Sequence, residues 1–425
     1  MRVLILGAGP AGVVAAERLR ALAPARGVRL DITMVSAEQY PPYAPPTMAD
    51  HFIHGGEERL FWRGRDIGQR LELNYLSGSR AQGIDTERRR VLLDDDRKLG
   101  YDRLIIATGS RLYAPLRGYD LPGVYNFKSL SAARSLVEQV HAGTVGSAIV
   151  VGAGFIGVEV ALLLADLGVS VLMLEKKDRV MPRVLDRETA GIVLKALRDR
   201  GIEVETGVEV GSFRGRRKVK GLRLQNGDRI KADAYVAATG VKPNIEFLEG
   251  SKVETDWGVI VDQTLSTNMP GIWAAGDVAE TRDRLSGERY VHAIWPNAVA
   301  QGAVVAERML GYDISYAGSE SMNSLRHLGI PLIAAGASSG RETLRLARDG
   351  WLRKIFLDDG RITGYRLAGN IGGAGVYRSL MLRGVDVQDF GTELVEPDFG
   401  IGKLSAIAPE MAARPQAPAG AYRLG

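Results

Sequence analysis

The sequence RVLILGAGPAGVVAAERLRAL, at residues 2–22, decides the fold class. A short apolar run of strand character leads into the glycine-rich turn GAGPAG, and an amphipathic helical pattern follows. The same pattern recurs at 147–168 as SAIVVGAGFIGVEVALLLADLG. Each copy is followed by a second apolar run, LDITMVS at 30–36 and VSVLMLE at 169–175. This duplicated strand–helix–strand unit predicts an α/β protein with two parallel sheets.

The glycines of both turns have a spacing that suits a dinucleotide. In the first turn Gly7 permits the tight bend, Gly9 lets the backbone approach a pyrophosphate, and Gly12 allows close helix–strand packing. Pro10 and Ala11 lie in the same turn, where free helix N–H groups favour an anion. The second turn repeats this arrangement with Gly152, Gly154, Phe155, Ile156 and Gly157.

A carboxylate is expected at the end of each second strand, where it meets ribose hydroxyls. In the second unit this residue is Glu175, and its charge favours NAD over NADP because it repels a 2′-phosphate. Lys176 and Lys177 follow directly and weaken that preference, so the choice stays open. In the first unit the strand ends at Ser36, and the nearest acid beyond it is Glu38. The alternative for Glu38 is an ordinary solvated loop acid.

The composition excludes several kinds of chemistry. The chain has 425 residues, enough for two to four domains, and its net charge of +5 is weak evidence for a nucleic-acid partner, which we do not expect. It has no cysteine, which excludes disulfides, thiol catalysis and an iron–sulfur cluster held by its own thiolates. Beyond His51 and His54 the histidines lack metal-ligand spacing, so we expect no metal site. With no apolar run of about 18 residues and no room for a signal peptide, we expect a cytoplasmic protein without a membrane span.

Five motifs in a fixed order resemble those of the FAD- and NAD-dependent flavoprotein reductases that have two dinucleotide-binding domains. They are GAGPAG, ATGS, GAGFIGVE, ATGVKPN and AAGDVA, and the resemblance covers roughly residues 1–315. It implies FAD on the first unit and NAD(H) on the second. It also implies cofactor contacts in the later turns, namely Ala107, Thr108, Gly109, Gly276 and Asp277 for FAD, and Thr239, Gly240 and Glu159 for NAD.

The strands that end in Ala-Thr-Gly indicate a nested layout, in which two Rossmann-like domains are interleaved. A hairpin predicted at 352–369 and a helix at 374–384 resemble the C-terminal domain of NADH–rubredoxin reductases and of the flavoprotein part of nitrite reductases. We therefore expect an FAD-binding domain at 1–112 and 243–317, an inserted NAD(H)-binding domain at 113–242, a C-terminal α+β interface domain at 318–408, and a flexible tail at 409–425.

The stretch YPPYAPPTMAD at 40–50 has four prolines and predicts a stiff loop. It resembles a loop that packs beside the FAD in ferredoxin and rubredoxin reductases, and Pro45 and Asp50 stand where those proteins have basic residues. In that family a lysine pairs with the glutamate that matches Glu159, our candidate catalytic side chain. Here two carboxylates would repel each other and raise one pKa, unless Asp50 points away or another base such as Lys128 takes the role.

Two further segments have alternative interpretations. HAIWPNAVAQG at 292–302 resembles the start of the helix that points at the flavin, which places Trp295 and Pro296 there. Trp295 either shields the flavin ring or is an ordinary packing aromatic. The basic run RGRRKVK at 214–220 either docks an acidic electron carrier or is a solvated hairpin turn.

Two dinucleotide sites without a thiol predict an oxidoreductase that moves hydride between NAD(H) and FAD. Electrons would then pass between FAD and a separate redox protein, with an iron–sulfur protein as the favoured partner. The flavoprotein subunits of 2-oxoacid oxidoreductases, such as phenylglyoxylate dehydrogenase, are one possible setting. The alternatives are a self-sufficient NADH-dependent reductase of quinone or oxygen, and a non-catalytic redox sensor. Partner identity, direction and stoichiometry stay open, including a homo-oligomer.

Overall fold

The computed structural model describes residues 1–348 and 350–407, so the predicted tail at 409–425 lies outside the described residues. The chain divides into two compact units. The first comprises Met1–Val180 and Leu197–Ser321, and the second comprises Met181–Ala196 and the chain from Met322 onward. The finer division of the first unit into FAD- and NAD-binding domains stays a prediction.

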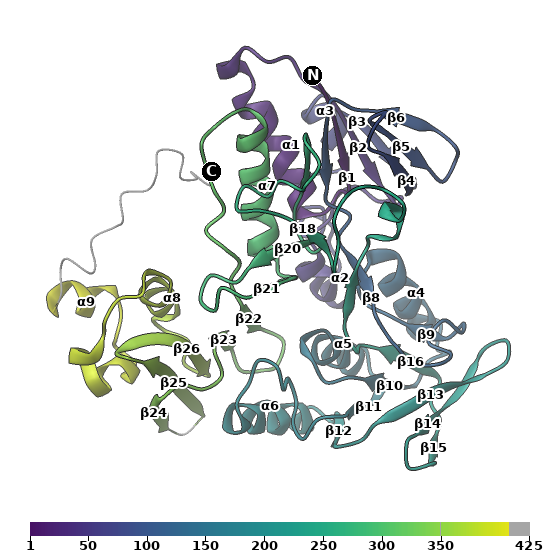
Figure 1. Ribbon diagram of the computed structural model, residues 1–425. Helices are drawn as coiled ribbons and strands as arrows, with labels where there is room; N and C mark the ends of the chain where they lie inside the picture. The colour runs from purple at the N-terminus through teal and green to yellow at the C-terminus, as the bar shows by residue number, and fades with distance from the viewer. Residues whose placement is uncertain (349, 408–425) are drawn as a thin grey trace. The chain divides into compact units, whose positions relative to one another are not determined.

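A five-stranded parallel sheet in the first unit has the strand order β19-β7-β1-β2-β3 (Figure 1). Its central strand, β1, pairs with β2 on one side and β7 on the other. Helix α1 (Pro10–Leu22) follows β1 and packs along α7 (Trp295–Met309). The strands of this sheet are β1 (Arg2–Leu6), β2 (Asp31–Ser36), β3 (Asn74–Ser77), β7 (Arg103–Ile106) and β19 (Ile272–Ala274).

The second parallel sheet has the order β12-β11-β10-β16-β9, so both sheets are confirmed. All five of its strands lie between β7 and β19 in the sequence. The segment that forms this sheet is therefore inserted between two strands of the first sheet. They are β9 (Val124–Tyr125), β10 (Ser147–Val151), β11 (Ser170–Glu175), β12 (Glu203–Thr206) and β16 (Ala234–Ala237), and the helices of the same stretch are α4 (Leu130–His141), α5 (Phe155–Asp166) and α6 (Arg187–Asp199).

A short antiparallel pair marks the two crossings between these sheets. Strand β8 (Ser110–Leu112) pairs with β17 (Val241–Pro243), where the chain leaves the first sheet and later returns. Three small sheets and several short helices complete the first unit. The sheets comprise β4 (Ala81–Asp85), β5 (Arg90–Leu93) and β6 (Lys98–Gly100); β13 (Val210–Gly215), β14 (Val219–Leu224) and β15 (Arg229–Ile230); and β18 (Val259–Ile260), β20 (Ala279–Arg282) and β21 (Arg289–Tyr290). The short helices are α2 (Met48–His54) and α3 (Ile67–Arg70). The 3-10 turns are Pro24–Arg26, Pro45–Thr47 and Glu246–Leu248.

The second unit contains a five-stranded antiparallel sheet of order β22-β23-β26-β25-β24. Its central hairpin, β25–β26, is the predicted pair of strands, and Asp359 and Gly360 form the turn. Helix α8 is the predicted helix that follows it. The elements are β22 (Met322–Leu325), β23 (Leu332–Gly336), β24 (Glu342–Arg348), β25 (Trp351–Asp358), β26 (Arg361–Ala368), α8 (Ala374–Arg383), the 3-10 segment Gln388–Val395 and α9 (Ile401–Ile407).

A buried ionic cluster joins the sheet of the second unit to the segment Met181–Ala196. Lys354 on β25 places its Nζ 2.7 Å from Asp186 Oδ1 and 2.7 Å from Glu188 Oε2. The Lys354 and Asp186 side chains are 11% and 15% exposed, so water screens this pair little, whereas Glu188 is 37% exposed. Burial alone would raise the pKa of Asp186, but its hydrogen bonds to Lys354 and Thr189 and the charge of Lys354 together lower it, which favours the ionised carboxylate.

Candidate active site

A cavity of about 1290 Å³ opens where the carboxyl ends of β1, β2, β7 and β19 meet the first turns of α1 and α7. Ligands of open parallel sheets bind at this edge. Two residues predicted to hold FAD, Gly12 and Pro296, are not part of the cavity wall. The predicted residues that do line it are Gly7, Gly9, Pro10, Ala11, Glu38, Pro45, Ala107, Thr108, Gly109, Gly276, Asp277 and Trp295.

The first glycine turn has room for a ligand at one position only. Gly7 has a φ of +113°, and a Cβ there would stand 2.0 Å from the carbonyl oxygen of Ala107. A Cβ at Gly12 would stand 2.1 Å from the carbonyl oxygen of Gly7, so this glycine serves packing. A Cβ at Gly9, by contrast, would meet no protein atom within 4 Å, and Gly9 faces the cavity. The turn is therefore shaped to admit a phosphate at the start of α1.

The second glycine turn repeats this geometry. Gly152 has a φ of +102°, and a Cβ at Gly157 would stand 2.0 Å from the carbonyl oxygen of Gly152. A Cβ at Gly154 would again meet nothing within 4 Å. Phe155 and Ile156 form the first turn of α5 directly after it. The two turns therefore match in their close contacts and in their open position.

Glu175 lies at the end of β11, as predicted, and its carboxylate supports the second glycine turn. The residue is 8% exposed; Oε2 accepts a 2.8 Å bond from the Ala153 N–H and Oε1 accepts one of 2.8 Å from the Lys177 N–H. Each carboxylate oxygen can accept a further bond, so a ribose hydroxyl remains compatible with this arrangement. On the surface, Lys176 Nζ lies 2.7 Å from Glu209 Oε1, so the charge of Lys176 is paired with Glu209.

Glu38 and Tyr43 connect the proline-rich loop to the start of α4. The Tyr43 hydroxyl donates to Glu38 Oε1 at 2.7 Å and accepts from the Leu130 N–H at 3.0 Å. The Ser131 hydroxyl donates to Glu38 Oε2 at 3.1 Å. Burial, followed by the nearby Glu38 charge, raises the pKa of Tyr43 well above its ordinary value. The loop is thus held against α4, and sequence reasoning missed Tyr43 although it is central among the four prolines.

The end of the same loop is helical. Pro45–Thr47 forms a 3-10 turn, and α2 begins at Met48, so Asp50 lies on a helix. Prolines are well tolerated at a helix start because the first N–H groups have no helical partner.

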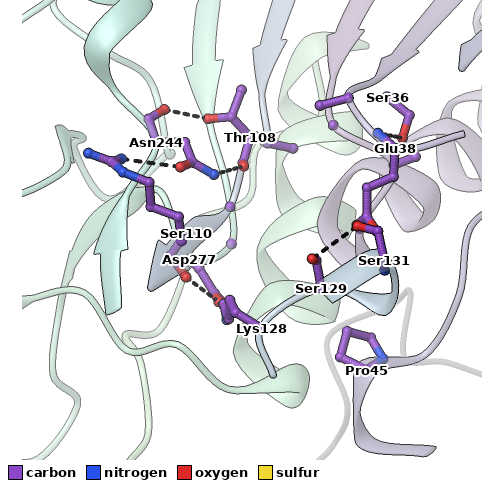
Figure 2. A pocket seen from close by; sticks show the side chains of 18 of the residues that line it. Ser36, Glu38, Pro45, Thr108, Ser110, Lys128, Ser129, Ser131, Asn244 and Asp277 are labelled. Carbon is purple, nitrogen blue, oxygen red and sulfur yellow. Dashed lines mark hydrogen bonds and ion pairs between the residues drawn. The ribbon is translucent and has the colours of Figure 1, made fainter. Parts of the chain in front are cut away.

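Asp277 accepts two bonds at the cavity wall. Lys128 Nζ lies 2.8 Å from Asp277 Oδ2, and the Ser110 hydroxyl donates to the same oxygen at 3.0 Å (Figure 2). Within the described residues no bond reaches Oδ1, so this oxygen is available for a ligand hydroxyl. The sequence offered Lys128 as a partner for Glu159, and this is wrong because Lys128 pairs with Asp277.

Glu159 lies on α5, which packs against α2. Burial, together with a smaller contribution from the charge of Asp50, raises the pKa of Glu159 to about 7. The charge of Asp50 therefore acts on Glu159 in the direction that was expected for two neighbouring carboxylates. Glu159 does not line the cavity described above. Its catalytic role stays a prediction.

The two Ala-Thr-Gly turns form hydrogen bonds between the two segments, near β8 and β17, in which the chain crosses between the parallel sheets. The Thr108 hydroxyl donates to the Asn244 carbonyl at 2.9 Å, and the Asn244 side-chain amide donates back to the Thr108 carbonyl at 2.8 Å (Figure 2). At the second turn, the Thr239 hydroxyl donates to the Tyr113 carbonyl at 2.6 Å, and the Gly240 carbonyl accepts from the Tyr113 N–H at 2.9 Å. Sequence reasoning did not single out Asn244, although it lies within the ATGVKPN motif.

Helix α7 contributes an aromatic residue to the cavity wall and a buried side chain that holds a neighbouring turn in place. Trp295, its first residue, lines the cavity and also packs edge-on against Trp62, with ring centroids 4.9 Å apart. Pro296 follows it in the first turn of the helix. Deeper in α7, the Gln301 side-chain oxygen accepts a 2.6 Å bond from the Gly276 N–H and so fixes the Gly-Asp turn. Sequence reasoning did not single out Gln301, although it lies within the segment HAIWPNAVAQG at 292–302.

The described residues show neither of two other features. In residues 1–348 and 350–407 no three His, Cys, Asp or Glu side chains gather as a metal site would require. In the same part of the chain no helix combines the length and apolar character needed to cross a membrane.

Comparisons with known proteins agree with this site. The family model for pyridine nucleotide-disulphide oxidoreductases matches residues 1–302. The chain is 29% identical to the NADH-dependent phenylglyoxylate dehydrogenase subunit epsilon of Aromatoleum evansii, over 95% of this chain and 96% of the relative. It is 31% identical to the ferredoxin–NAD(+) reductase subunit of the benzene 1,2-dioxygenase system of Pseudomonas putida, over 74% and 75%. A ferredoxin reductase from Rhodopseudomonas palustris has a TM-score of 0.80 at 26% identity, over 92% and 98%.

The match to the family model covers more than half of the chain, and both glycine turns have the geometry that such a family requires. The predicted family, fold class, enzyme class and cofactors are therefore confirmed. The chain belongs to the pyridine nucleotide-disulphide oxidoreductase family and is an oxidoreductase that uses FAD and NAD(H).

Proposed function

We propose that this enzyme transfers electrons between NAD(H) and a separate iron–sulfur protein by way of FAD. The observation that carries the proposal is that the sequence has no cysteine, although its family is named for disulphide chemistry. Without a thiol pair, electrons must leave the flavin directly for an acceptor outside the chain. The ferredoxin–NAD(+) reductase and ferredoxin reductase among its relatives support an iron–sulfur partner.

We assign the cavity to FAD, on the basis of its volume and of the chemistry of its wall. Gly9 and the α1 N-terminus would hold the pyrophosphate, Glu38 the ribose hydroxyls, and Asp277 Oδ1 a further hydroxyl. The first turn of α7 would direct its N–H groups, with Trp295 beside them, at the flavin. When bound, FAD accepts hydride from a nicotinamide and releases electrons singly, and the chain supplies their placement.

We assign NAD(H) to the second glycine turn, with Gly154 facing the pyrophosphate and Glu175 the ribose. This assignment supports the nested division predicted from the sequence, with an FAD part at 1–112 and 243–317 and an NAD part at 113–242. The segment 318–408 then forms the interface domain. The repeated open position at Gly9 and Gly154 supports a pyrophosphate at each of the two turns.

Anaerobic reduction tests the function directly. NADH should bleach the visible absorbance of the bound flavin, and a ferredoxin or rubredoxin added afterwards should restore it within seconds. Oxygen and a soluble quinone serve as rival acceptors. Rapid turnover with either of these, together with no turnover with the iron–sulfur proteins, would overturn the proposal. Flavin that NADH fails to bleach would instead favour a redox sensor.

A more specific setting is a subunit that faces NAD within a 2-oxoacid oxidoreductase. The alignment with the phenylglyoxylate dehydrogenase subunit extends over 95% of this chain and 96% of that subunit, which supports a shared role for the C-terminal unit as well. In this setting the reduced iron–sulfur partner donates electrons and NAD⁺ accepts them. Formation of NADH from reduced ferredoxin and NAD⁺ is the test, and cell fractionation tests the cytoplasmic location that we also propose.

A further inference from the structure

The sheet β13–β15 carries a concentration of positive charge that the proposed function does not use. Residues 210–231 contain eight basic residues and a single acid, Asp228, which gives this stretch a net charge of +7. The other 403 residues together have a net charge of −2, because the whole chain has +5. We call these eight residues the basic sheet; all are exposed, and they are Arg214, Arg216, Arg217, Lys218, Lys220, Arg223, Arg229 and Lys231.

The strand register separates this charge from the core. Phe213, Leu222 and Ile230 stand opposite one another across the three strands, and Phe213 and Leu222 belong to a buried cluster. The neighbouring row places Arg223 opposite Arg229. Because successive side chains of a strand point to opposite faces, the arginine row lies on the outer face of the sheet.

In the described part of the chain, the basic sheet forms no close ion pair. In the described residues none of its eight side chains lies within 4 Å of a carboxylate, whereas exposed arginines elsewhere do, as in the pair of Arg97 and Asp95. The single acid of the stretch, Asp228, is bonded to Asn226. Like charges directly opposite on a sheet, as Arg223 and Arg229 are, destabilise it. Self-repulsion of this kind is compensated when an anionic surface covers it.

We propose that the basic sheet is a docking surface for a carboxylate-rich partner protein. Arginine is suited to this because its planar fork binds a carboxylate with two parallel hydrogen bonds. The face has no exposed large hydrophobic residue, such as a membrane-inserting surface would need, and no exposed aromatic on which a nucleic-acid base would stack. A second copy of the chain would bring its own positive sheet against this one, which disfavours a symmetric dimer here.

This surface is separate from the cavity. No residue of 210–231 lines the cavity wall, so a partner bound at the basic sheet leaves the flavin accessible. Figure 1 draws β13–β15 below β16 and away from the first turns of α1 and α7. The contact therefore holds a partner in place and is not itself the route of electron transfer. It goes beyond the proposed function, because it would exist whichever acceptor takes the electrons.

Charge reversal on the holoenzyme tests the surface. One variant combines Arg214→Glu, Arg216→Glu and Arg217→Glu; the matched control combines Lys98→Glu, Arg289→Glu and Arg326→Glu, three exposed basic residues outside the sheet. The probe is fluorescein-labelled poly-L-glutamate, and binding is followed by fluorescence anisotropy at about 0.15 M salt. We expect the sheet variant to raise the dissociation constant at least about tenfold and the control to change it less than about twofold.

A second variant tests the same surface without charge reversal. Replacing the opposed pair, Arg223→Gln with Arg229→Gln, should weaken probe binding and raise the melting temperature, because a repulsive contact is lost. In every variant NADH should still bleach the flavin at the wild-type rate, even with the probe bound. Failure of that reduction in the wild type would contradict the proposed function and leave the docking surface intact.

Three results would overturn the docking proposal. The first is equal weakening in the sheet variant and the control, which would show general charge attraction only. The second is the absence of probe binding to the wild type. The third is tighter binding of short duplex DNA, or of phosphatidylserine vesicles, through the same arginines, which would assign the surface to a nucleic acid or a membrane.

Discussion

Replacing Glu159 by glutamine isolates the free-energy cost of ionising this buried carboxylate on α5. The pKa of Glu159 is about 7 in the folded protein, against an ordinary value of 4.5, with burial as the larger cause and Asp50 as the second. Between these two pH values the folded state binds more protons than the unfolded state. The free energy of unfolding must therefore fall as pH rises from about 4.5, and the loss is complete above about pH 7.

The size of this effect follows from the shift. Each pKa unit corresponds to about 1.4 kcal/mol, so an ionised Glu159 costs the fold about 3 kcal/mol above neutral pH. Glu159→Gln removes the charge and keeps the shape. We expect it to be about 3 kcal/mol more stable than the wild type near pH 8, and to match the wild type within about 0.5 kcal/mol near pH 4.

Urea unfolding of the holoenzyme, followed by tryptophan fluorescence at a series of pH values, gives the required curves. Glu249→Gln is the control, because Glu249 is an exposed carboxylate in the same unit. The difference between wild type and Glu159→Gln should grow with pH and then level off, and the control should show no such growth. A difference that is the same at every pH would refute the argument, because it would reflect packing and not ionisation.

Five further substitutions, in the proline-rich loop, in the first glycine turn and at Lys354, test other contacts. Tyr43→Phe removes a bond to a carboxylate and a bond from a backbone N–H, so we expect it to cost about 2–4 kcal/mol of unfolding free energy and to weaken FAD binding to the apoprotein, whereas Tyr40→Phe in the same loop should do neither. Gly9→Ala should keep the melting temperature and raise the dissociation constant for FAD about 5–150-fold, while Gly12→Ala should unfold more easily by about 1–3 kcal/mol because its methyl meets backbone. Lys354→Met breaks a buried ionic cluster and should cost about 3–5 kcal/mol in urea unfolding, and a loss below about 1 kcal/mol would contradict this.

The parts of the fold that the sequence predicted are those that local rules determine. The turn after β1 needs a positive φ at Gly7 and close packing at Gly12, and only glycine satisfies both. The hairpin at the C-terminal unit was predictable for the same reason, since an Asp-Gly pair joins two alternating strands. The residues that make up each of these signals are close together in the chain, so the signal can be recognised from a single sequence.

The contacts that the sequence did not reveal join residues far apart in the chain. Lys128 and Asp277 are separated by 149 positions, and Lys354 and Asp186 by 168. No periodicity marks either partner, and each has several charged neighbours that would serve equally well in the sequence. The choice of Lys128 as a partner for Glu159 was wrong for this reason: the resemblance named a basic residue, but only the packing decides which carboxylate it meets.

The two Ala-Thr-Gly turns contain predicted cofactor contacts, and they also form hydrogen bonds between the two segments in which the chain crosses between the parallel sheets. Both threonine hydroxyls donate to backbone carbonyls of the opposite crossing segment, at 2.9 Å for Thr108 and 2.6 Å for Thr239. The two short strands between them, β8 and β17, pair with each other and so fix where the chain leaves one parallel sheet and returns from the other. Transfer of hydride between two bound dinucleotides depends on their separation, and a misplacement of about 1 Å costs roughly 100-fold in rate. A threonine at each end of the crossing, hydrogen-bonded to the backbone, therefore stabilises the geometry on which the proposed hydride transfer depends.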